Sequence, residues 1–290
     1  KLLRWCVGWP VNTESLLPAP RFALTAVHCC AQARCVVLEN LENKEADIVK
    51  IRYIEPVDSD LFDQSRTVLL NNMAAPNTTV EVCHVTLPPE LSGPMLPTVP
   101  LYLTEIVQEV LRAEEEGCDA AIIGCCSDPA LPDAQRAANI PVVGPLQAAA
   151  ATAAGRGLRL GILCPDEHAW KTTANWLRAN LRHYGLSDVV GPIRFVSMRS
   201  PDDTEGIIGN TELKAADLSD RFRKKLHENA VPAANLMLEE DEVQAVLFGC
   251  TLWGGMISEV SETVDALCLD PLITALRFAE LQAGIERYNA

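Results

Sequence analysis

Two cysteines stand at matching places in the two halves of the chain, and thiols can accept and donate protons. Cys125 closes the stretch IIGC and Cys250 closes the stretch LFGC. Each follows a short apolar run typical of a buried strand and stands where the chain must turn. Because ligands of open α/β sheets bind at the carboxyl ends of the strands, we expect both thiols to line one ligand site between two lobes.

A pair of thiols on opposite sides of a bound molecule can invert a carbon next to a carbonyl or carboxylate group. One thiolate removes the proton, the other thiol returns a proton to the opposite face, and the roles exchange for the mirror-image substrate. The amides that follow each cysteine can stabilise the enolate-like transition state. The same placement is expected to lower the thiol pKa. This chemistry needs no cofactor and no metal.

The alternative interpretation is that both cysteines are small buried hydrophobic residues, as strand-end cysteines commonly are. Either cysteine alone would favour that interpretation, whereas matched Gly-Cys ends in the two halves favour a functional pair. No metal-ligand cluster and no phosphate-binding glycine motif stands out in the sequence from about residue 50 onward.

The segments that must position these thiols alternate between strand and helix patterns. Strands are expected at residues 51–55, 79–85, 119–125, 141–144, 158–164, 193–197, 244–250 and 266–269. Helices are expected at residues 100–117, 145–155, 166–184, 212–242 with a break near Pro232, and 271–287. Strands without apolar–polar alternation, separated by helices, indicate parallel sheets covered on both faces. With right-handed crossovers, the expected fold class is a doubly wound α/β fold.

The composition restricts the classes of function. The 290 residues are 48% hydrophobic, which is enough to bury a core. Lys and Arg number 24 against 39 Asp and Glu, for a net charge of −15, and no basic run appears, so we expect no nucleic-acid partner. The eleven cysteines are about 4% of the chain, below the share typical of disulfide scaffolds.

The first residues differ from the rest of the chain. Residues 1–38 carry Lys1, Arg4, Arg21 and Arg34 against the single acid Glu14, and show no clear period and no long apolar run. We expect no membrane span here. Residues 1–49 are expected to form a poorly structured extension, or to reflect where the chain is taken to begin. An organellar targeting segment is the alternative.

Both cysteine segments resemble motifs of a known superfamily. Residues 117–129, GCDAAIIGCCSDP, resemble the first cysteine motif of the hydantoin and allantoin racemase branch of the aspartate/glutamate/hydantoin racemase superfamily. Residues 245–251, AVLFGCT, resemble the second motif, in a form shared more with glutamate racemases. The stretch IPVVG at 140–144 is similar to a family strand, and Gly93-Pro94 is similar to a family loop. The resemblance covers about residues 50–290.

The resemblance implies an α/β fold of two pseudo-symmetric lobes, each a short parallel sheet flanked by helices, with the active site in the inter-lobe cleft. Residues 50–147 and 264–290 would form lobe 1 and residues 148–263 would form lobe 2, with the C-terminal helix returning to lobe 1. It implies cofactor-independent racemisation or epimerisation of a small-molecule substrate, with Cys125 and Cys250 as the two acid/base thiols. It also suggests a homo-oligomer.

Further residues are expected to bind the substrate. The stretch EPVDS at 55–59 stands where the branch carries an Asn-Pro-Asn-Thr-type motif. Asp58 is a candidate to orient Cys125, and Ser59 to bind substrate. The alternative is that both cap a helix starting near Asp60.

The residues that follow the two thiols complete the expected set. Cys126, Ser127 and Thr251 are the candidates there. Leu252 stands where glutamate racemases place a His, which argues against a His-assisted second thiol. Trp253 forms either an apolar wall for a bulky substituent or ordinary packing.

Three functions remain open. The first is a racemase or epimerase for a hydantoin-like or amino-acid-like compound. The second is a decarboxylase or cis-trans isomerase of the same fold that uses one or both thiols. The third is a non-catalytic small-molecule binding protein. Thiols that must cycle as acid and base favour a reducing compartment, so the cytoplasm is the expected location.

Overall fold

The computed structural model describes residues 48–93, 96, 102–166, 170–198 and 215–289. Residues 48–290 form one compact unit. The expected extension 1–49 lies outside the described residues, except for Ile48 and Val49, and Val49 already begins the first strand. Pro94 of the expected Gly-Pro loop is also outside them.

The first sheet contains four parallel strands in the order β2-β1-β3-β4. Their bounds are Val49–Glu55 for β1, Thr78–His84 for β2, Ala120–Ile123 for β3 and Val142–Val143 for β4. The two central strands are buried through most of their length, because both faces of the sheet are covered. Alternate residues therefore pack into different cores: Ile122 lies in a cluster with α9 (Pro271–Asn289), whereas Ile123 lies in one with α3 (Tyr102–Glu115).

The second sheet repeats this topology, with the order β6-β5-β7-β8. Its strands are β5 at Leu160–Asp166, β6 at Val190–Ser197, β7 at Ala245–Phe248 and β8 at Leu267–Leu269, and all pair in parallel. In each sheet the third strand along the chain lies beside the first, so β3 and β7 occupy the same position. These two strands precede Cys125 and Cys250, and the weak sequence repeat around the cysteines therefore reflects a repeated fold.

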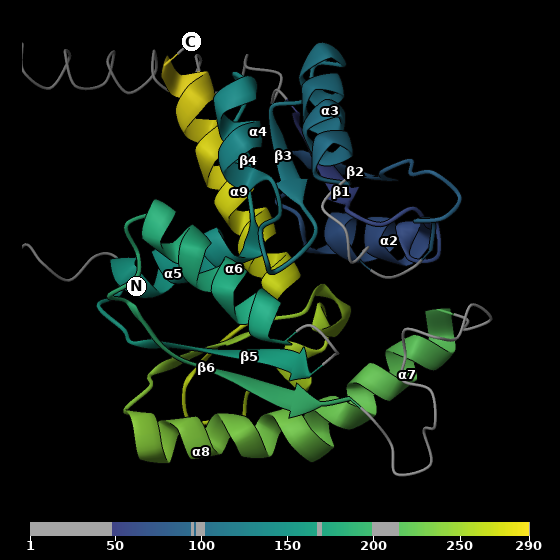
Figure 1. The fold of residues 1–290 in the computed structure, drawn as a ribbon. Coiled ribbons are helices and arrows are strands. Elements are labelled where there is room, and N and C mark those ends of the chain that lie inside the picture. Colours follow the sequence, from purple (N-terminus) through teal and green to yellow (C-terminus); the bar gives the residue numbers. More distant parts are fainter. Residues whose placement is uncertain (1–47, 94–95, 97–101, 167–169, 199–214, 290) are drawn as a thin grey trace, which may run out of the picture. The chain divides into compact units, whose positions relative to one another are not determined.

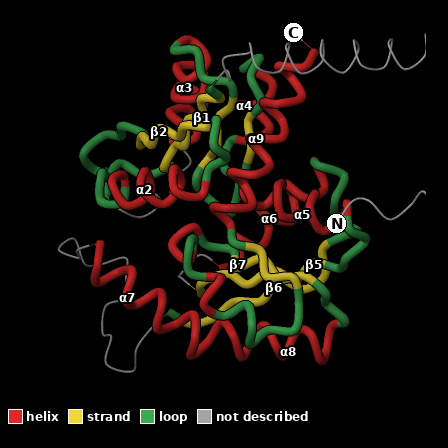
Figure 2. Tube along the Cα trace, turned by 180° about the vertical axis from the view of Figure 1, so that it is seen from behind, coloured by secondary structure: helices red, strands yellow, loops and turns green. Residues whose placement is uncertain are grey.

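The helices cover both sheets (Figure 1). The remaining ones are α2 at Asp63–Met73, α4 at Leu131–Ala137, α5 at Pro145–Gly155, α6 at Trp170–His183, α7 at Ala215–Lys225 and α8 at Val231–Asp241. Figure 2 shows the second sheet from behind, with α8 along one face and α5 and α6 along the other. None of the helices in the described ranges is long and apolar enough to cross a membrane.

The two parallel sheets confirm the expected α/β class, and each expected strand overlaps an observed one. The helical segment 212–242, expected with a break near Pro232, is α7 and α8 joined by a π-helical turn at Leu226–Ala230, just before Pro232. A proline has no N–H to donate to the preceding turn, which favours an irregularity there. The short helix α4 was not expected as a regular element. Helix α2 was expected only in the alternative interpretation of Asp58 and Ser59, as a helix starting near Asp60.

The boundary between the two lobes also differs from the expected one near the C-terminus. Strand β8 pairs with β7, so residues 267–269 belong to the second sheet, whereas residues from 264 onward were expected in lobe 1. Helix α9, which begins at Pro271, packs against β1 and β3 of the first sheet, as expected for the C-terminal helix. Helix α5 contributes Ala148 to the core of the first sheet and Leu146 to the core of the second.

Replacing Gly124, which follows β3, is predicted to destabilise the fold. A Cβ at this position would stand 2.5 Å from the hydroxyl oxygen of Tyr53, a fully buried side chain that has no room to move. We expect Gly124→Ala to lower the free energy of unfolding by about 1–3 kcal/mol, measured as the midpoint of urea unfolding. The control Gly284→Ala on α9 meets nothing within 4 Å and should raise stability by about 0.5–1 kcal/mol. Equal effects of the two substitutions would contradict this prediction.

Candidate active site

The turn after β3 places Cys125 at the carboxyl end of the first sheet. The Gly124 N–H donates to Ile54 O of the neighbouring strand at 2.8 Å, and the Cys125 N–H donates back to Ile123 O at 2.9 Å. The Asp128 N–H then closes the turn onto Cys125 O at 2.9 Å. Cys125 as a whole residue is partly exposed, and its sulfur lies 3.2 Å from the hydroxyl oxygen of Ser127.

The turn after β7 repeats the same hydrogen bonds around Cys250. The Gly249 N–H donates to Leu163 O of the neighbouring strand at 2.6 Å, and the Cys250 N–H donates to Phe248 O at 2.8 Å. The Trp253 N–H closes this turn onto Cys250 O at 3.0 Å. The Cys250 thiol is also partly exposed. The two cysteines are therefore equivalent in local structure as well as in sheet position.

A hydrogen bond joins the two turns. The buried Thr251 hydroxyl donates to Gly124 O at 3.2 Å, so the residue after the second cysteine contacts the residue before the first. The charged forms of Cys125 and Cys250 both raise the pKa of the buried thiols Cys126 and Cys164, which places the four thiols in one neighbourhood. Burial is the larger cause of both shifts.

Burial raises the pKa of the Cys125 thiol to about 11, although the hydroxyl and N–H of Ser127 favour the thiolate. The charges of Asp128 and Glu55 add to the rise. The expected lowering of the thiol pKa by the strand-end amides is therefore wrong for Cys125. Removing the thiolate from water costs more free energy than the hydrogen bonds of the turn provide. Cys125 rests as a neutral thiol, a form that can donate a proton.

Asp128 anchors the Cys125 turn to the second part of the fold. Its buried carboxylate accepts the N–H groups of Leu146 and Gln147, at 3.0 and 2.8 Å, and so caps the start of α5. The Tyr184 hydroxyl, just after α6, donates to the same carboxylate at 3.0 Å. Asn180 of α6 donates to Ser127 O at 2.8 Å. Sequence reasoning gave Asp128 no role beyond its place in the family motif, because its partners lie 18 or more residues away.

Asp58 and Ser59 make local hydrogen bonds. The Asp58 carboxylate accepts the Leu87 N–H at 3.2 Å, and its main-chain oxygen accepts the Gly93 N–H at 3.1 Å. The Ser59 hydroxyl oxygen accepts the Leu61 N–H at 3.3 Å. Neither side chain caps α2. The helix begins at Asp63, and the residue before it makes no side-chain capping hydrogen bond. Their roles in orienting Cys125 and in binding substrate stay predictions.

Trp253 is part of the core. Its side chain is fully buried, its indole N–H donates to Phe222 O at 3.1 Å, and its ring packs edge-on against Phe222 and Phe248. Of the two interpretations of this residue, ordinary packing is confirmed.

Sequence reasoning missed a charged group at the ends of β1 and β2. The carboxylate of Glu55 accepts a hydrogen bond from Arg66 Nε at 3.1 Å, and both side chains are buried. His84 Nδ1 lies 2.8 Å from a carboxylate oxygen of Asp63. Glu55 and His84 end adjacent parallel strands, so they lie at the same edge of the sheet as Cys125. Their positions at or next to the ends of the predicted strands 51–55 and 79–85 were the available signal.

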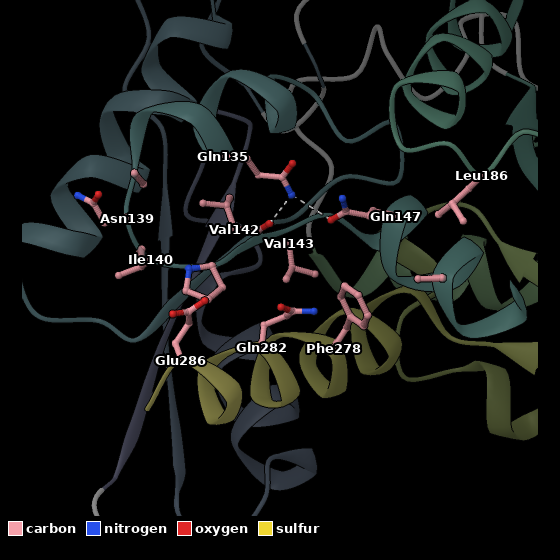
Figure 3. Close-up of a pocket in the computed structure, with 13 residues that line it drawn as sticks. Gln135, Asn139, Ile140, Val142, Val143, Gln147, Leu186, Phe278, Gln282 and Glu286 are labelled. Atoms are coloured by element: carbon pink, nitrogen blue, oxygen red, sulfur yellow. Dashed lines mark hydrogen bonds between the residues drawn. The ribbon is translucent and has the colours of Figure 1, made fainter. Parts of the chain in front are cut away.

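A cavity of about 410 Å³ opens at edge strand β4 (Figure 3). Residues of α4, α5 and α9 line it, including Gln135, Gln147 and Gln282, and it contains none of the expected site residues. The Gln135 amide bridges Val142 O and Gln147 Oε1, at 2.8 and 3.1 Å. Among the described residues, no group of three His, Cys, Asp or Glu side chains is placed to hold a metal ion.

The family model for Asp/Glu/hydantoin racemases matches residues 73–279, more than half of the chain. The chain belongs to the Asp/Glu/hydantoin racemase family. A curated relative is the hydantoin racemase of Pseudomonas sp. strain NS671, which is 23% identical over 180 residues. That alignment covers 62% of this chain and 64% of the relative, less than two thirds of its length.

Solved structures of family members share the fold. The allantoin racemase from Pseudomonas fluorescens superposes with a TM-score of 0.63 at 16% identity, over 82% of this chain and 92% of that one. The allantoin racemase from Klebsiella pneumoniae gives a TM-score of 0.60 at 19% identity, over 82% and 89%. A glutamate racemase from Francisella tularensis gives 0.50 at 14% identity, over 82% of each chain.

Asp128 is predicted to make stability depend on pH. Burial raises the pKa of its carboxyl to about 7, against the opposing effect of its three hydrogen bonds. The folded protein therefore binds a proton that the unfolded chain, with a pKa of about 4, has already lost. The contribution of Asp128 to the unfolding free energy should fall as pH rises from about 4 to about 7.

Urea unfolding between pH 5 and 8 tests this expectation. Asp128→Asn should remove this fall in the unfolding free energy. The difference in unfolding free energy between parent and variant should therefore change with pH. The control Asp133→Asn, on the exposed side of α4, should follow the parent profile within about 0.5 kcal/mol. Parallel profiles for the parent and Asp128→Asn would contradict the assignment.

Proposed function

We propose that this protein is a cofactor-independent racemase or epimerase that inverts a carbon next to a carbonyl, with Cys125 and Cys250 as the acid/base pair. The observation that carries the proposal is the hydrogen bond from Thr251 to Gly124 O, which joins two strand-end turns of the same geometry. Membership of the racemase family supports the same activity.

The mechanism assigns one thiol to each face of the substrate. With Cys125 as the neutral thiol, Cys250 removes the proton from the substrate carbon as thiolate, and Cys125 delivers a proton to the other face. The enantiomeric substrate uses the reverse assignment. When Cys125 becomes the thiolate, the hydroxyl and N–H of Ser127 stabilise its charge. This gives Ser127 a role at the thiol, whereas Thr251 holds the two turns together.

The substrate class proposed is a small hydantoin-like or amino-acid-like compound. Relatives named as hydantoin racemase and allantoin racemases favour a cyclic ureide. We place this substrate in a cleft between the carboxyl ends of the two sheets, with Asp58, Ser59 and Cys126 as further candidates at its border. A homo-oligomer in the cytoplasm, which keeps both thiols reduced, completes the proposal.

Single substitutions of the two thiols test the mechanism. Enantiopure hydantoins, allantoin, aspartate and glutamate are incubated with enzyme in deuterium oxide, and mass and optical rotation are followed. Cys125→Ser and Cys250→Ser should each lower the rate of racemisation by about 10²–10⁴-fold, as expected for loss of a general acid or base. Each can retain hydrogen exchange from one enantiomer.

The control is Cys268→Ser, a partly exposed cysteine on β8 that pairs in register with Val246 and lies in neither turn. It should racemise at the parent rate. If both single variants at 125 and 250 keep the parent rate, the two-thiol mechanism is wrong. Loss of carbon dioxide from a malonate with only one thiol essential would instead assign a decarboxylase of the same fold.

A further inference from the structure

Arg66 and Glu55 form a buried ion pair. Arg66 Nε donates to Glu55 Oε1 at 3.1 Å, and each side chain is only 7% exposed. The guanidinium also lies over the ring of Phe62, 5.5 Å from its centre. Removing two opposite charges from water costs free energy that their attraction alone seldom repays. A pair in this position therefore calls for a second explanation.

The helix that carries Arg66 runs along the Cys250 turn. Phe62, at the start of α2, belongs to the core cluster against which Cys250 packs. Leu69, one turn after Arg66, lies so close to Gly255 that a Cβ there would stand 2.8 Å from its methyl group. Contacts before and after Arg66 thus place this part of α2 beside the turn that carries Cys250.

Electrostatics agrees with this geometry. Burial alone would lower the pKa of Arg66, but the charges of Glu55, Tyr53 and Cys250 hold it above its usual value. The attraction is mutual, so the Arg66 cation favours the anionic form of Cys250 to the same extent. Cys125 has the opposite surroundings, because the charges of Asp128 and Glu55 disfavour its thiolate.

The repeated topology makes this asymmetry visible. Ile54 and Leu163 occupy equivalent positions in the two sheets, so Glu55 in the first corresponds to Cys164 in the second. Likewise Ser127, whose hydroxyl contacts Cys125, corresponds to Leu252, which has no hydroxyl to offer. Two turns with the same backbone therefore differ in the polar groups around their thiols.

We propose that Arg66, fixed by Glu55, is a positioning residue that keeps Cys250 as the thiolate in the resting enzyme while Cys125 stays a thiol. This deepens the proposed function and rests on it, since it decides which thiol acts first as base. The enzyme would then rest in the form that accepts one enantiomer.

Other titratable groups face the Cys250 turn. Asp270, between β8 and α9, accepts the Gly255 N–H at 2.6 Å, which places its carboxyl group at the same turn. Burial raises the pKa of Asp270, and the charge of Arg66 lowers it. Cys126 and Cys164 are held as thiols by burial. Arg66 is thus a cation whose charge favours a thiolate at Cys250.

The experiment measures the ionisation of Cys250 without any substrate. Iodoacetamide alkylates thiolates, so the rate of Cys250 modification against pH, followed by peptide mass spectrometry, reports its ionisation. Because burial raises the pKa of Cys268, this thiol of the same molecule serves only as an internal check, and the Cys250 midpoint in the parent protein should lie below the ordinary thiol value of about 8.5.

Three variants test the role of Arg66. Two of them should slow the alkylation of Cys250, and the third should accelerate it. Arg66→Gln should raise the Cys250 midpoint by about one pH unit, which slows Cys250 alkylation about tenfold at a pH well below both midpoints. Because this variant leaves Glu55 buried and unpaired, the double variant Glu55→Gln/Arg66→Met removes both charges and should slow alkylation in the same way. Glu55→Gln leaves the cation uncompensated and should accelerate it. A merely structural pair would move both single variants in the same direction.

Urea unfolding shows whether the double variant is folded. An unchanged Cys250 midpoint in the folded double variant would overturn the proposal. So would a shift of the same sign in Glu55→Gln and Arg66→Gln. The result is separable from the proposed function. If the midpoint moves as expected but no compound is racemised, the role of Arg66 stands and the racemase assignment fails. If both thiols are essential for racemisation but the midpoint does not move, only this inference fails.

Discussion

A glycine precedes each cysteine because the neighbouring strand leaves no space for a side chain. At Gly124 the obstacle is the buried Tyr53 ring, and at Gly249 it is the Leu163 carbonyl oxygen. In both places the close approach lets the glycine N–H reach the adjacent strand, so the chain turns at a fixed residue and the cysteine follows. The register of both thiols depends on this contact, and so does the bond from Thr251 that joins the turns.

Buried polar groups hold the first turn to elements far away in sequence. Asp128 caps α5, and its carboxylate also accepts the Tyr184 hydroxyl. Asn180 binds the carbonyl oxygen of Ser127. Because α6 packs in the core of the second sheet, these bonds couple the Cys125 turn to the opposite lobe. The same burial that makes these bonds strong also raises the pKa of Asp128 and Cys125.

The two halves share a backbone but not an electrostatic environment. Their sheets have the same strand order and their cysteine turns the same hydrogen bonds. Acidic groups lie near Cys125, whereas a guanidinium held by Glu55 lies near Cys250. An acid/base pair needs one protonated and one ionised member at rest. A duplicated fold can meet that need when its side chains differ around otherwise equivalent thiols.

The sequence by itself determined the strands, most of the helices and the two Gly-Cys ends, because apolar runs and local turns depend on neighbouring residues. Only the tertiary structure decided that β8 joins the second sheet, that Thr251 binds Gly124 O, and that Arg66 pairs with Glu55 beside Cys250. It also showed that burial raises the pKa of Cys125. These features arise from contacts between distant segments and from exclusion of water, which no local pattern records.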